Sequence, residues 1–420
     1  MTLSRRTLIQ AAGAGLFSSS VLAQNKAAAN IVIIGGGFAG ATAAKYLKRF
    51  NPRLNITLIE PNDAFIMCPM SNRVITGSMN IRDITRAYSA FTTKYGIKWM
   101  HASADAIDPD KRQVRVGKDV VSYDRLIVSP GIDFNYDAIG GMGNAAAQLA
   151  IPHAWKAGEQ TRRLKDQLYA MPQGGVIAMH IPKVPYRCPP GPYERASLLA
   201  NFLKSKNPKA KLFVFDSNPD IQAKKGLFEK VWKTNFPSQL EYIPNAAIES
   251  VDVASKTMTF EVLPKLKADV LNIIPPQRCG GIASRSGLAN VDRRWCGVDF
   301  LSYASLVHPD IHVLGDSIAS PPGMPKSGHM ANQEAKVCAA AIAAWSLGQA
   351  IPSMPIIANT CYSFVSETEA MHVTGVYRYD AAKKTMAAVA GAGGLSVAPT
   401  LLEGIHAMGW AGNILADSLE

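Results

Sequence analysis

The segment that most constrains the fold is a glycine-rich turn between an apolar run and a helical pattern, near the start of the chain. Residues 31–34 read Ile-Val-Ile-Ile, as a strand buried on both faces of a parallel sheet requires. They lead directly into G-x-G-x-x-G at Gly35, Gly37 and Gly40. Glycine allows a tight turn at the first position, close approach of a pyrophosphate at the second and close helix packing at the third. The segment therefore predicts a dinucleotide site at the N-terminus of a helix.

The residues after the turn complete a β-α-β unit. The spacing of apolar residues predicts a helix that turns Ala44 and Leu47 inward and Lys45 outward. A second strand at 56–59 ends at Glu60, which stands 20 residues after the last glycine of the motif. A carboxylate at this place accepts hydrogen bonds from ribose hydroxyls. Strand, glycines, helix and acid all stand in the required order, which predicts a bound dinucleotide.

A distant segment favours FAD over NAD as that dinucleotide. The apolar residues 311–314 end in Gly315-Asp316. In flavoenzymes with two dinucleotide domains, an aspartate at this place presents its carboxylate to the flavin ribitol. The strand at 123–131 is similar to the other strand that returns to the FAD domain in those enzymes. We therefore expect FAD as the cofactor.

A helix start after this strand supplies two more candidate cofactor contacts. Residues 325–329 read Pro-Lys-Ser-Gly-His and precede an Ala-rich helical run at 330–345. The positive end of the helix dipole would stabilise a reduced, anionic flavin. Lys326 and Gly328 therefore join the expected FAD site.

A second strand-helix-strand frame begins at Gly174 but lacks a glycine motif. Five prolines stand between residues 182 and 192, and Cys188 stands among them. Proline has no N–H to donate to a pyrophosphate. A helical pattern resumes at 196–204 and a strand at 212–215. We expect this domain to keep its frame and to bind no NAD(P)H.

The first residues of the chain have the pattern of an export signal. Arg5-Arg6 precede a short apolar stretch, which ends at Val21-Leu22-Ala23. This combination predicts a twin-arginine signal peptide with a mature chain that begins near Gln24. The expected location is the periplasm, a compartment that permits disulfides.

The order of these elements predicts an α/β fold. It has two Rossmann-like dinucleotide-binding domains of the FAD/NAD(P)-disulfide-oxidoreductase type, followed by a C-terminal α+β interface domain. The expected segments are a signal peptide at 1–23, the first part of the FAD-binding domain at 28–150, a second Rossmann-like domain without nucleotide at 151–272, the second part of the FAD-binding domain at 273–350 and the interface domain at 351–420.

Several other classes of function are disfavoured by the sequence. The formal net charge is +12, but no nucleic-acid motif accompanies it, and the eight lysines between residues 204 and 233 are interpreted as a solvated helix face. No C-x-x-C-H motif is present, so any haem must be on a partner chain. Pro309 separates His308 from His312, and we expect no metal site.

Five segments together resemble the flavoprotein subunit of flavocytochrome c sulfide dehydrogenase and, more distantly, sulfide:quinone oxidoreductases. They are residues 68–72, 186–195, 274–278, 325–332 and 359–363. The resemblance implies that Cys68 bonds covalently to FAD, and that Cys188 and Cys361 form a redox disulfide beside the isoalloxazine. It places Glu194 close by, and it puts the haem on a separate c-type cytochrome subunit.

Each of these residues also has a purely structural interpretation. Cys68 could be a buried core thiol, since free cysteine behaves as a small hydrophobe. A bridge between Cys188 and Cys361 could serve stability alone, and Glu194 could be an exposed carboxylate at a helix start. The loss of the phosphate turn favours the redox interpretation, because it opens access to the flavin face. If Cys68 is flavin-bound and Cys188 pairs with Cys361, then at least one of Cys279, Cys296 and Cys338 is unpaired.

The function expected from the resemblance is flavin-dependent oxidation of sulfide, with electrons passing by FAD to the cytochrome subunit. Two alternatives stay open. One is a sulfide:quinone oxidoreductase, and the other is a non-catalytic flavoprotein that assists a sulfur-oxidising system.

The tail contains an expected hairpin at 375–378 and 386–389, and then a helix. Leu401, Ile405 and Met408 share one face of that helix, and a membrane-binding role is the rival to a protein interface. His406 is the one residue between 400 and 420 able to carry a positive charge, so we expect no membrane insertion.

Overall fold

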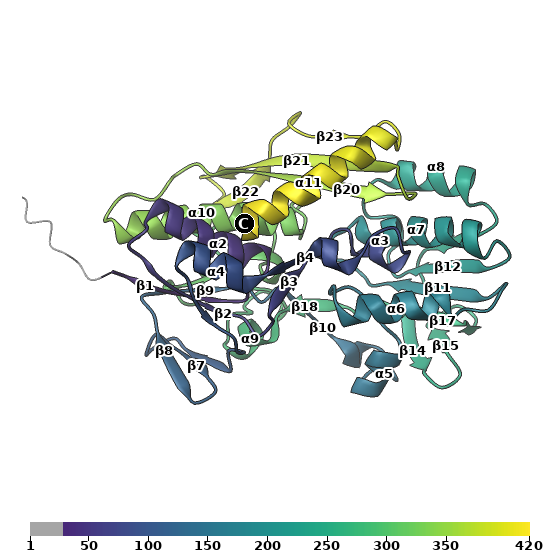
Figure 1. The fold of residues 1–420 in the computed structure, drawn as a ribbon, viewed down its shortest axis with the longest axis horizontal. Helices are drawn as coiled ribbons and strands as arrows, with labels where there is room; N and C mark the ends of the chain where they lie inside the picture. The colour runs from purple at the N-terminus through teal and green to yellow at the C-terminus, as the bar shows by residue number, and fades with distance from the viewer. Residues whose placement is uncertain (1–27) are drawn as a thin grey trace, which may run out of the picture.

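The computed structural model describes residues 28–420, so the signal peptide expected at 1–23 lies outside the described residues. The first domain is built on a five-stranded parallel sheet (Figure 1). The strands in spatial order are β19 (Ile311–Val313), β9 (Arg125–Val128), β1 (Asn30–Ile34), β2 (Asn55–Ile59) and β5 (Lys98–Met100). The apolar side chains of β1 are at most 5% exposed, as expected for a central strand covered on both faces.

Helices α2 (Phe38–Phe50) and α10 (Gly328–Ser346) pack against one another beside this sheet, although they are far apart in the sequence. The domain also contains smaller elements. These are β3 (Ala64–Ile66), α3 (Ser71–Ile75), η1 (Ile81–Ile84), β4 (Thr85–Ala87), α4 (Tyr88–Tyr95), β6 (Ala106–Asp108), β7 (Gln113–Val116), β8 (Asp119–Ser122), α9 (Gly281–Arg285) and η3 (Gly315–Ser317).

The second domain has a four-stranded parallel sheet. Its strands in spatial order are β13 (Leu240–Ile243), β12 (Lys211–Asp216), β11 (Val176–Ile181) and β17 (Val270–Ile273). The other elements are η2 (Tyr136–Ala138), α5 (Ala145–Ala150), α6 (Glu159–Tyr169), α7 (Gly191–Lys206), α8 (Lys225–Asn235), β14 (Ile248–Asp252), β15 (Thr257–Phe260) and β16 (Leu266–Lys267). Strands β10 (Ile132–Phe134) and β18 (Gln277–Cys279) pair antiparallel where the chain passes between the two domains.

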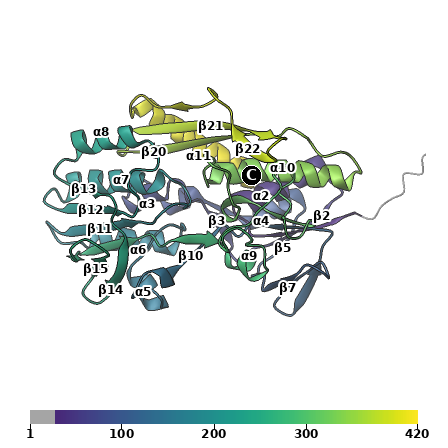
Figure 2. The same cartoon turned by 180° about the vertical axis from the view of Figure 1, so that it is seen from behind.

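The C-terminal segment forms a third layer that lies along both domains, as both views show (Figures 1 and 2). It contains β20 (Ile356–Phe364), β21 (Ala370–Asp380), β22 (Thr385–Ala388), β23 (Gly394–Leu395) and α11 (Leu401–Leu419). Strand β20 contacts α10 of the first domain and α7 of the second. The expected α/β fold with two Rossmann-like domains and a C-terminal α+β layer is confirmed.

One sequence expectation about α2 is wrong. Lys45 was expected on the outward face, but it is buried because α11 covers that face. Its Nζ donates to the carbonyl oxygen of Ala416 at 2.8 Å.

The apolar face of α11 is exposed to solvent, since the side chains of Leu401 and Ile405 are 58% and 59% exposed. Among residues 28–420, no helix combines the length and apolar character needed to cross a membrane.

Candidate active site

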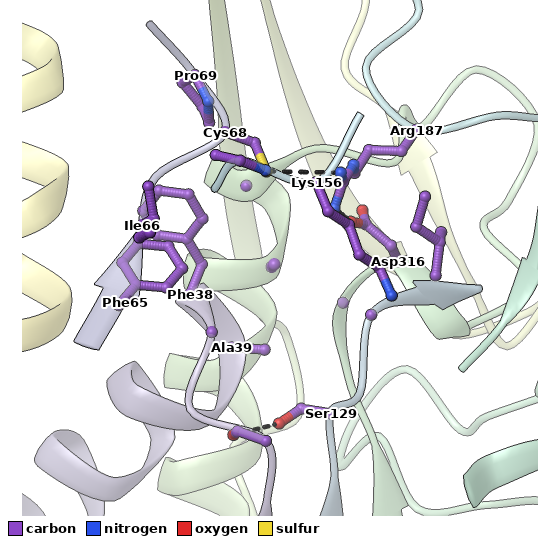
Figure 3. Close-up of a pocket in the computed structure, with 18 of the residues that line it drawn as sticks. Phe38, Ala39, Phe65, Ile66, Cys68, Pro69, Ser129, Lys156, Arg187 and Asp316 are labelled. Carbon is purple, nitrogen blue, oxygen red and sulfur yellow. Dashed lines mark hydrogen bonds and ion pairs between the residues drawn. The ribbon is translucent and has the colours of Figure 1, made fainter. Parts of the chain in front are cut away.

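A cavity of about 570 Å³ lies where the three layers meet. Its wall includes the glycine turn of the first domain, the start of α7 from the second domain and residues 360–362 of β20. This volume is in the range of cofactor and ligand sites. Figure 3 shows Cys68, Arg187 and Asp316 directed toward the same space from different segments.

The glycine turn leaves room for a ligand at one position only. A Cβ on Gly35, whose φ is +93°, would stand 2.5 Å from the carbonyl oxygen of Ser129, and a Cβ on Gly40 would stand 1.8 Å from the carbonyl oxygen of Gly35. Both glycines are therefore required by the chain itself. A Cβ on Gly37 would meet nothing within 4 Å, and Gly37 lines the cavity. This is the space that a pyrophosphate needs against the backbone.

Two buried carboxylates stand where the sequence places the ribose and ribitol contacts. Glu60 Oε2 accepts a hydrogen bond from the Gly36 N–H at 2.8 Å. Asp316 Oδ1 is buried and has no hydrogen-bond partner among the described residues. An orphaned buried oxygen is costly, so Asp316 fits a hydroxyl donor of a bound cofactor. The residues present therefore fit FAD.

The start of α10 contributes differently from the expectation. The Ser327 hydroxyl caps the helix by accepting from the Met330 N–H at 3.1 Å, and Gly328 lines the cavity. Gly328 must lack a side chain, because a Cβ would stand 2.5 Å from the ring of Phe38. Lys326 is outside the lining residues, and its Nζ lies behind them, 3.3 Å from the backbone oxygen of Asp316. Gly315 lines the cavity, and its N–H donates to Glu334 at 2.8 Å.

Cys68 lines the cavity with its thiol held among polar groups. Its Sγ is 3.4 Å from the Ala157 N–H donor and 3.5 Å from Arg187 Nη2. Arg187 also lies 3.6 Å from Asp316 Oδ2, so its side chain spans the cavity between the two expected cofactor contacts (Figure 3). A half-buried thiol that is open to the cavity is available for a cofactor bond, whereas a core thiol is not.

Cys188 and Cys361 line this same cavity, although they are 173 residues apart in the sequence. Both are free thiols in this structure. The Cys188 N–H donates to the carbonyl oxygen of Lys326 at 2.8 Å, which ties the proline-rich loop to the start of α10. Asn359 Nδ2 donates to Cys361 Sγ at 3.3 Å. Burial raises the pKa of both thiols, and Lys224 opposes this shift at Cys361.

Glu194 is buried beside the two cysteines rather than exposed at a helix start. Its Oε2 accepts from Asn72 Nδ2 at 2.8 Å, and its Oε1 accepts from the Phe364 N–H at 2.9 Å. Burial raises the pKa of this carboxyl, and the two hydrogen bonds oppose that shift. A carboxyl with a raised pKa, at the wall of a cavity, is suited to transfer protons.

Sequence reasoning missed Lys224, which was counted among the solvated lysines. Its Nζ is buried and donates to the Cys361 carbonyl oxygen at 2.7 Å, the Ser363 hydroxyl at 2.9 Å and the Met371 carbonyl oxygen at 3.0 Å. This ammonium therefore fastens the β20–β21 hairpin to the second domain. Burial lowers the pKa of Lys224 to about 8. No sequence signal distinguishes this lysine from its neighbours.

Arg195 was missed too, although it is the largest of the fully buried side chains among residues 28–420. It donates to Asn72 Oδ1 at 2.9 Å and to Asn272 Oδ1 at 3.0 Å. Asn72 thus joins Glu194 and Arg195, and these bonds connect α3, α7 and β17. Asn72 and Arg195 lie inside segments that carry the family resemblance, but nothing in their spacing indicates that they share a network.

Three family models match this chain in succession. A pyridine nucleotide-disulphide oxidoreductase model matches residues 29–168. The central domain of the sulfide dehydrogenase [flavocytochrome c] flavoprotein chain matches residues 161–275, and the flavin-binding domain of flavocytochrome c sulphide dehydrogenase matches residues 353–419. With the fold and the cavity, these matches define a flavin-binding oxidoreductase.

Comparison with individual proteins narrows the assignment. Over 44 residues the chain is 52% identical to the sulfide dehydrogenase [flavocytochrome c] flavoprotein chain of Chlorobaculum thiosulfatiphilum, covering 92% of that sequence and 10% of this one. The chain belongs to this family of flavoprotein chains.

Sulfide-quinone reductases are also related. The Aquifex aeolicus enzyme is 28% identical over 54% of this chain and 53% of its own length, so the alignment spans about half of that relative. The mouse mitochondrial sulfide:quinone oxidoreductase is 23% identical over 68% of this chain and 65% of its own length. A solved structure of the Aquifex aeolicus enzyme has the same fold, with a TM-score of 0.74, 21% identity and coverage of 93% of this chain and 91% of that one.

Proposed function

We propose that this protein oxidises sulfide at the cavity, through a redox disulfide between Cys188 and Cys361, and passes electrons by FAD to a separate c-type cytochrome. The observation that carries this proposal is that Cys68, Cys188 and Cys361 come from three separate layers and line one cavity. The family membership, shared with a sulfide dehydrogenase flavoprotein chain, supports sulfide as the substrate.

The chemistry begins with hydrosulfide as the nucleophile. Attack on one sulfur of the oxidised pair forms a new S–S bond and breaks the old one, which leaves one cysteine as a persulfide and the other as a thiolate. Arg187 and Lys224 supply positive charge near the thiols. Glu194 holds or releases a proton beside them. Bound FAD supplies a two-electron acceptor that can give its electrons up singly, which suits a haem.

The glycine turn and the buried carboxylates support the proposed cofactor contacts. Gly35, Gly37 and Gly40 would form the pyrophosphate turn, Glu60 would bind the ribose, and Gly315-Asp316 would meet the ribitol. Cys68 would carry a covalent bond to the flavin. The loop at 182–190 turns toward α10 through Cys188, and its prolines lack the N–H donors for a second pyrophosphate, which supports the absence of NAD(P)H.

The acceptor is proposed to dock at the α11 side of the cavity. His329, Tyr362 and Trp410 line both the flavin cavity and a second hollow bordered by Ile405 and His406 of α11. The ring of Trp410 lies 5.9 Å from that of His329 and 6.2 Å from that of Tyr362. These aromatic rings form a short route from the cavity to the surface.

A quinone is the alternative acceptor, because α11 presents an apolar stripe at this surface. Its members are Leu401, Leu402, Ile405 and Met408, which are between 39% and 60% exposed. The test supplies the purified holoprotein with sulfide and either a c-type cytochrome or a short-chain quinone. Sulfide-dependent reduction of the cytochrome supports the proposal. If only the quinone is reduced, the acceptor is a quinone and not a cytochrome. If sulfide causes no electron transfer at all, the protein is a non-catalytic flavoprotein that assists a sulfur-oxidising system.

The site of action is proposed to be the periplasm. The support is the twin-arginine pattern at 1–23, which the sequence alone provides. Fractionation of cells that express the full chain tests this assignment, since R5K with R6K should retain the protein in the cytoplasm.

A further inference from the structure

A second pair of cysteines lies behind the cavity and takes no part in the proposed reaction. Cys279 ends β18, and Cys296 follows it by seventeen residues. Their exposed fractions are 1% and 0%, and neither lines the cavity. Each thiol shifts the pKa of the other through a mutual side-chain hydrogen bond, which lowers the pKa of Cys279 and raises that of Cys296.

Backbone hydrogen bonds hold the two cysteine-bearing segments side by side. The Cys279 N–H donates to the Arg294 carbonyl oxygen at 2.9 Å, and Arg294 Nε donates to the Gln277 carbonyl oxygen at 2.5 Å. The Cys296 N–H donates to the carbonyl oxygen of Ser317 at 3.0 Å, and the Gly280 N–H reaches the Ser317 hydroxyl at 3.3 Å. Ser317 therefore ties both segments to the same point. The proximity of the two cysteines therefore follows from the backbone hydrogen bonds that hold their segments together.

We propose that Cys279 and Cys296 form a disulfide in the oxidised protein. Two S–H bonds break and one S–S bond forms, and the two electrons and two protons pass to a disulfide oxidant, which becomes a pair of thiols. The burial of both sulfurs requires that the exchange occurs while residues 279–296 are still open, during folding. The bond does not depend on the proposed function, because these sulfurs lie outside the cavity.

The position of this disulfide gives it a structural consequence for the cofactor site. Ser317, which both cysteine segments contact, directly follows Asp316. Trp295, next to Cys296, lies under Lys326, whose Nζ is 3.8 Å from the ring centroid. Closing the loop at 279–296 removes conformations from the unfolded chain and so stabilises the folded protein, including the contacts around Ser317.

The disulfide changes the cysteine count in a way that can be measured. With Cys68 on the flavin and Cys188 paired with Cys361, it leaves Cys338 as the one thiol of the six. Cys338 is also 0% exposed, on α10, and contacts no other cysteine among residues 28–420 by hydrogen bond. It is therefore a matched buried control.

Peptide mapping tests the disulfide directly. Holoprotein purified aerobically, and protein refolded in a buffer of oxidised and reduced glutathione, are denatured in an alkylating reagent without reductant and digested with trypsin. Cleavage after Arg278 and Arg294 puts Cys279 in the peptide 279–285 and Cys296 in the peptide 295–326. The expected result is a linked pair of these two peptides that separates on reduction. Alkylation of both cysteines in both samples overturns the proposal.

A variant series supplies a second measurement. C279S, C296S and the double variant C279S/C296S should lower the denaturation midpoint of the oxidised protein by the same amount, because one bond is lost in each. Under reducing conditions the unsubstituted protein also lacks the bond, so the part of the difference in denaturation midpoint that the bond causes should disappear. The difference in midpoint between C338S and the unsubstituted protein should be the same with and without reductant. Additive effects of C279S and C296S that reductant does not change would contradict the disulfide. Loss of sulfide oxidation in C188S leaves this result untouched, so the two proposals fail separately.

Discussion

Glu194 Oε1 accepts a hydrogen bond from the Phe364 N–H at 2.9 Å, which joins the first turn of α7 to the end of β20, three residues after Cys361. The bond connects the helix that follows Cys188 to the strand that carries Cys361. Lys224 makes the parallel connection by donating to the carbonyl oxygen of Cys361 itself. The distance between Cys188 and Cys361 is thus governed by buried polar contacts from the second domain to the C-terminal layer.

Glu194 is predicted to have two roles, one in stability and one in proton transfer, which the variants E194A and E194Q separate. E194A removes the acceptor of the buried Phe364 N–H, and leaving such a donor unsatisfied costs about 1–3 kcal/mol. E194Q retains an acceptor at the same place, so urea denaturation should show a much smaller loss of unfolding free energy. E194Q should nevertheless slow reduction by sulfide, since an amide cannot exchange the proton. Equal stability loss in both variants would show that the hydrogen bond is not what matters.

Gly37 gives a test of cofactor binding that leaves the fold intact. A Cβ at Gly37 meets nothing within 4 Å, so G37A should not lower the thermal midpoint of the apoprotein. The methyl group would occupy the place of the pyrophosphate, and the purified variant should contain much less flavin. G226A is the matched control, because a Cβ on Gly226 in α8 also meets nothing within 4 Å, away from the cavity. Full flavin content in G37A would contradict the assignment of the turn.

Cys68 is predicted to carry the flavin covalently. Acid precipitation of the unsubstituted protein should leave the yellow colour in the pellet, whereas C68S should release it into the supernatant. C338S, which removes a thiol buried in α10, should behave as the unsubstituted protein does. Absorbance of the two fractions measures the outcome, and release of flavin from the unsubstituted protein would rule out the covalent bond.

The lowered pKa of Lys224 predicts that the rate of reduction by sulfide depends on pH. Burial lowers the pKa of Lys224 to about 8, so its ammonium loses its charge as the pH rises through 8, and the stabilisation of a nearby thiolate is lost with it. The rate of reduction by sulfide should fall above this pH. K224R keeps a positive charge there, so the ratio of the K224R rate to the unsubstituted rate should rise between pH 7 and pH 9. Using the ratio cancels the ionisation of sulfide itself, and a ratio independent of pH would exclude this role for Lys224.

The fold was predictable because its signals are local. The run Ile31–Ile34, the glycine turn and Glu60 follow one another within 30 residues, and each has a fixed place in a β-α-β unit. The closure of α11 over α2 was not predictable from either helix, and it reversed the expectation for Lys45. Periodicity shows which face of a helix is apolar, but it does not show that another element covers the polar face.

The candidate site likewise contains residues that the sequence indicates and residues that only the structure shows. Cys68, Cys188 and Cys361 stand in distinctive segments, so the family resemblance is sufficient to point to them. Lys224 and Arg195 act through buried contacts with residues far away in the sequence, such as Met371 and Asn272. A lysine in a lysine-rich stretch has the pattern of a solvated face, and only its three-dimensional neighbours show otherwise.

The proposed chemistry depends most on the pairing of Cys188 with Cys361 at the flavin. The direct measurement is rapid anaerobic mixing of sulfide with the purified holoprotein, in which the loss of the visible absorbance of the flavin is recorded over time. C188S and C361S should each retain flavin and show no reduction by sulfide, while C338S should be reduced at the unsubstituted rate. Reduction of C188S or C361S at the unsubstituted rate would contradict a redox role for this pair.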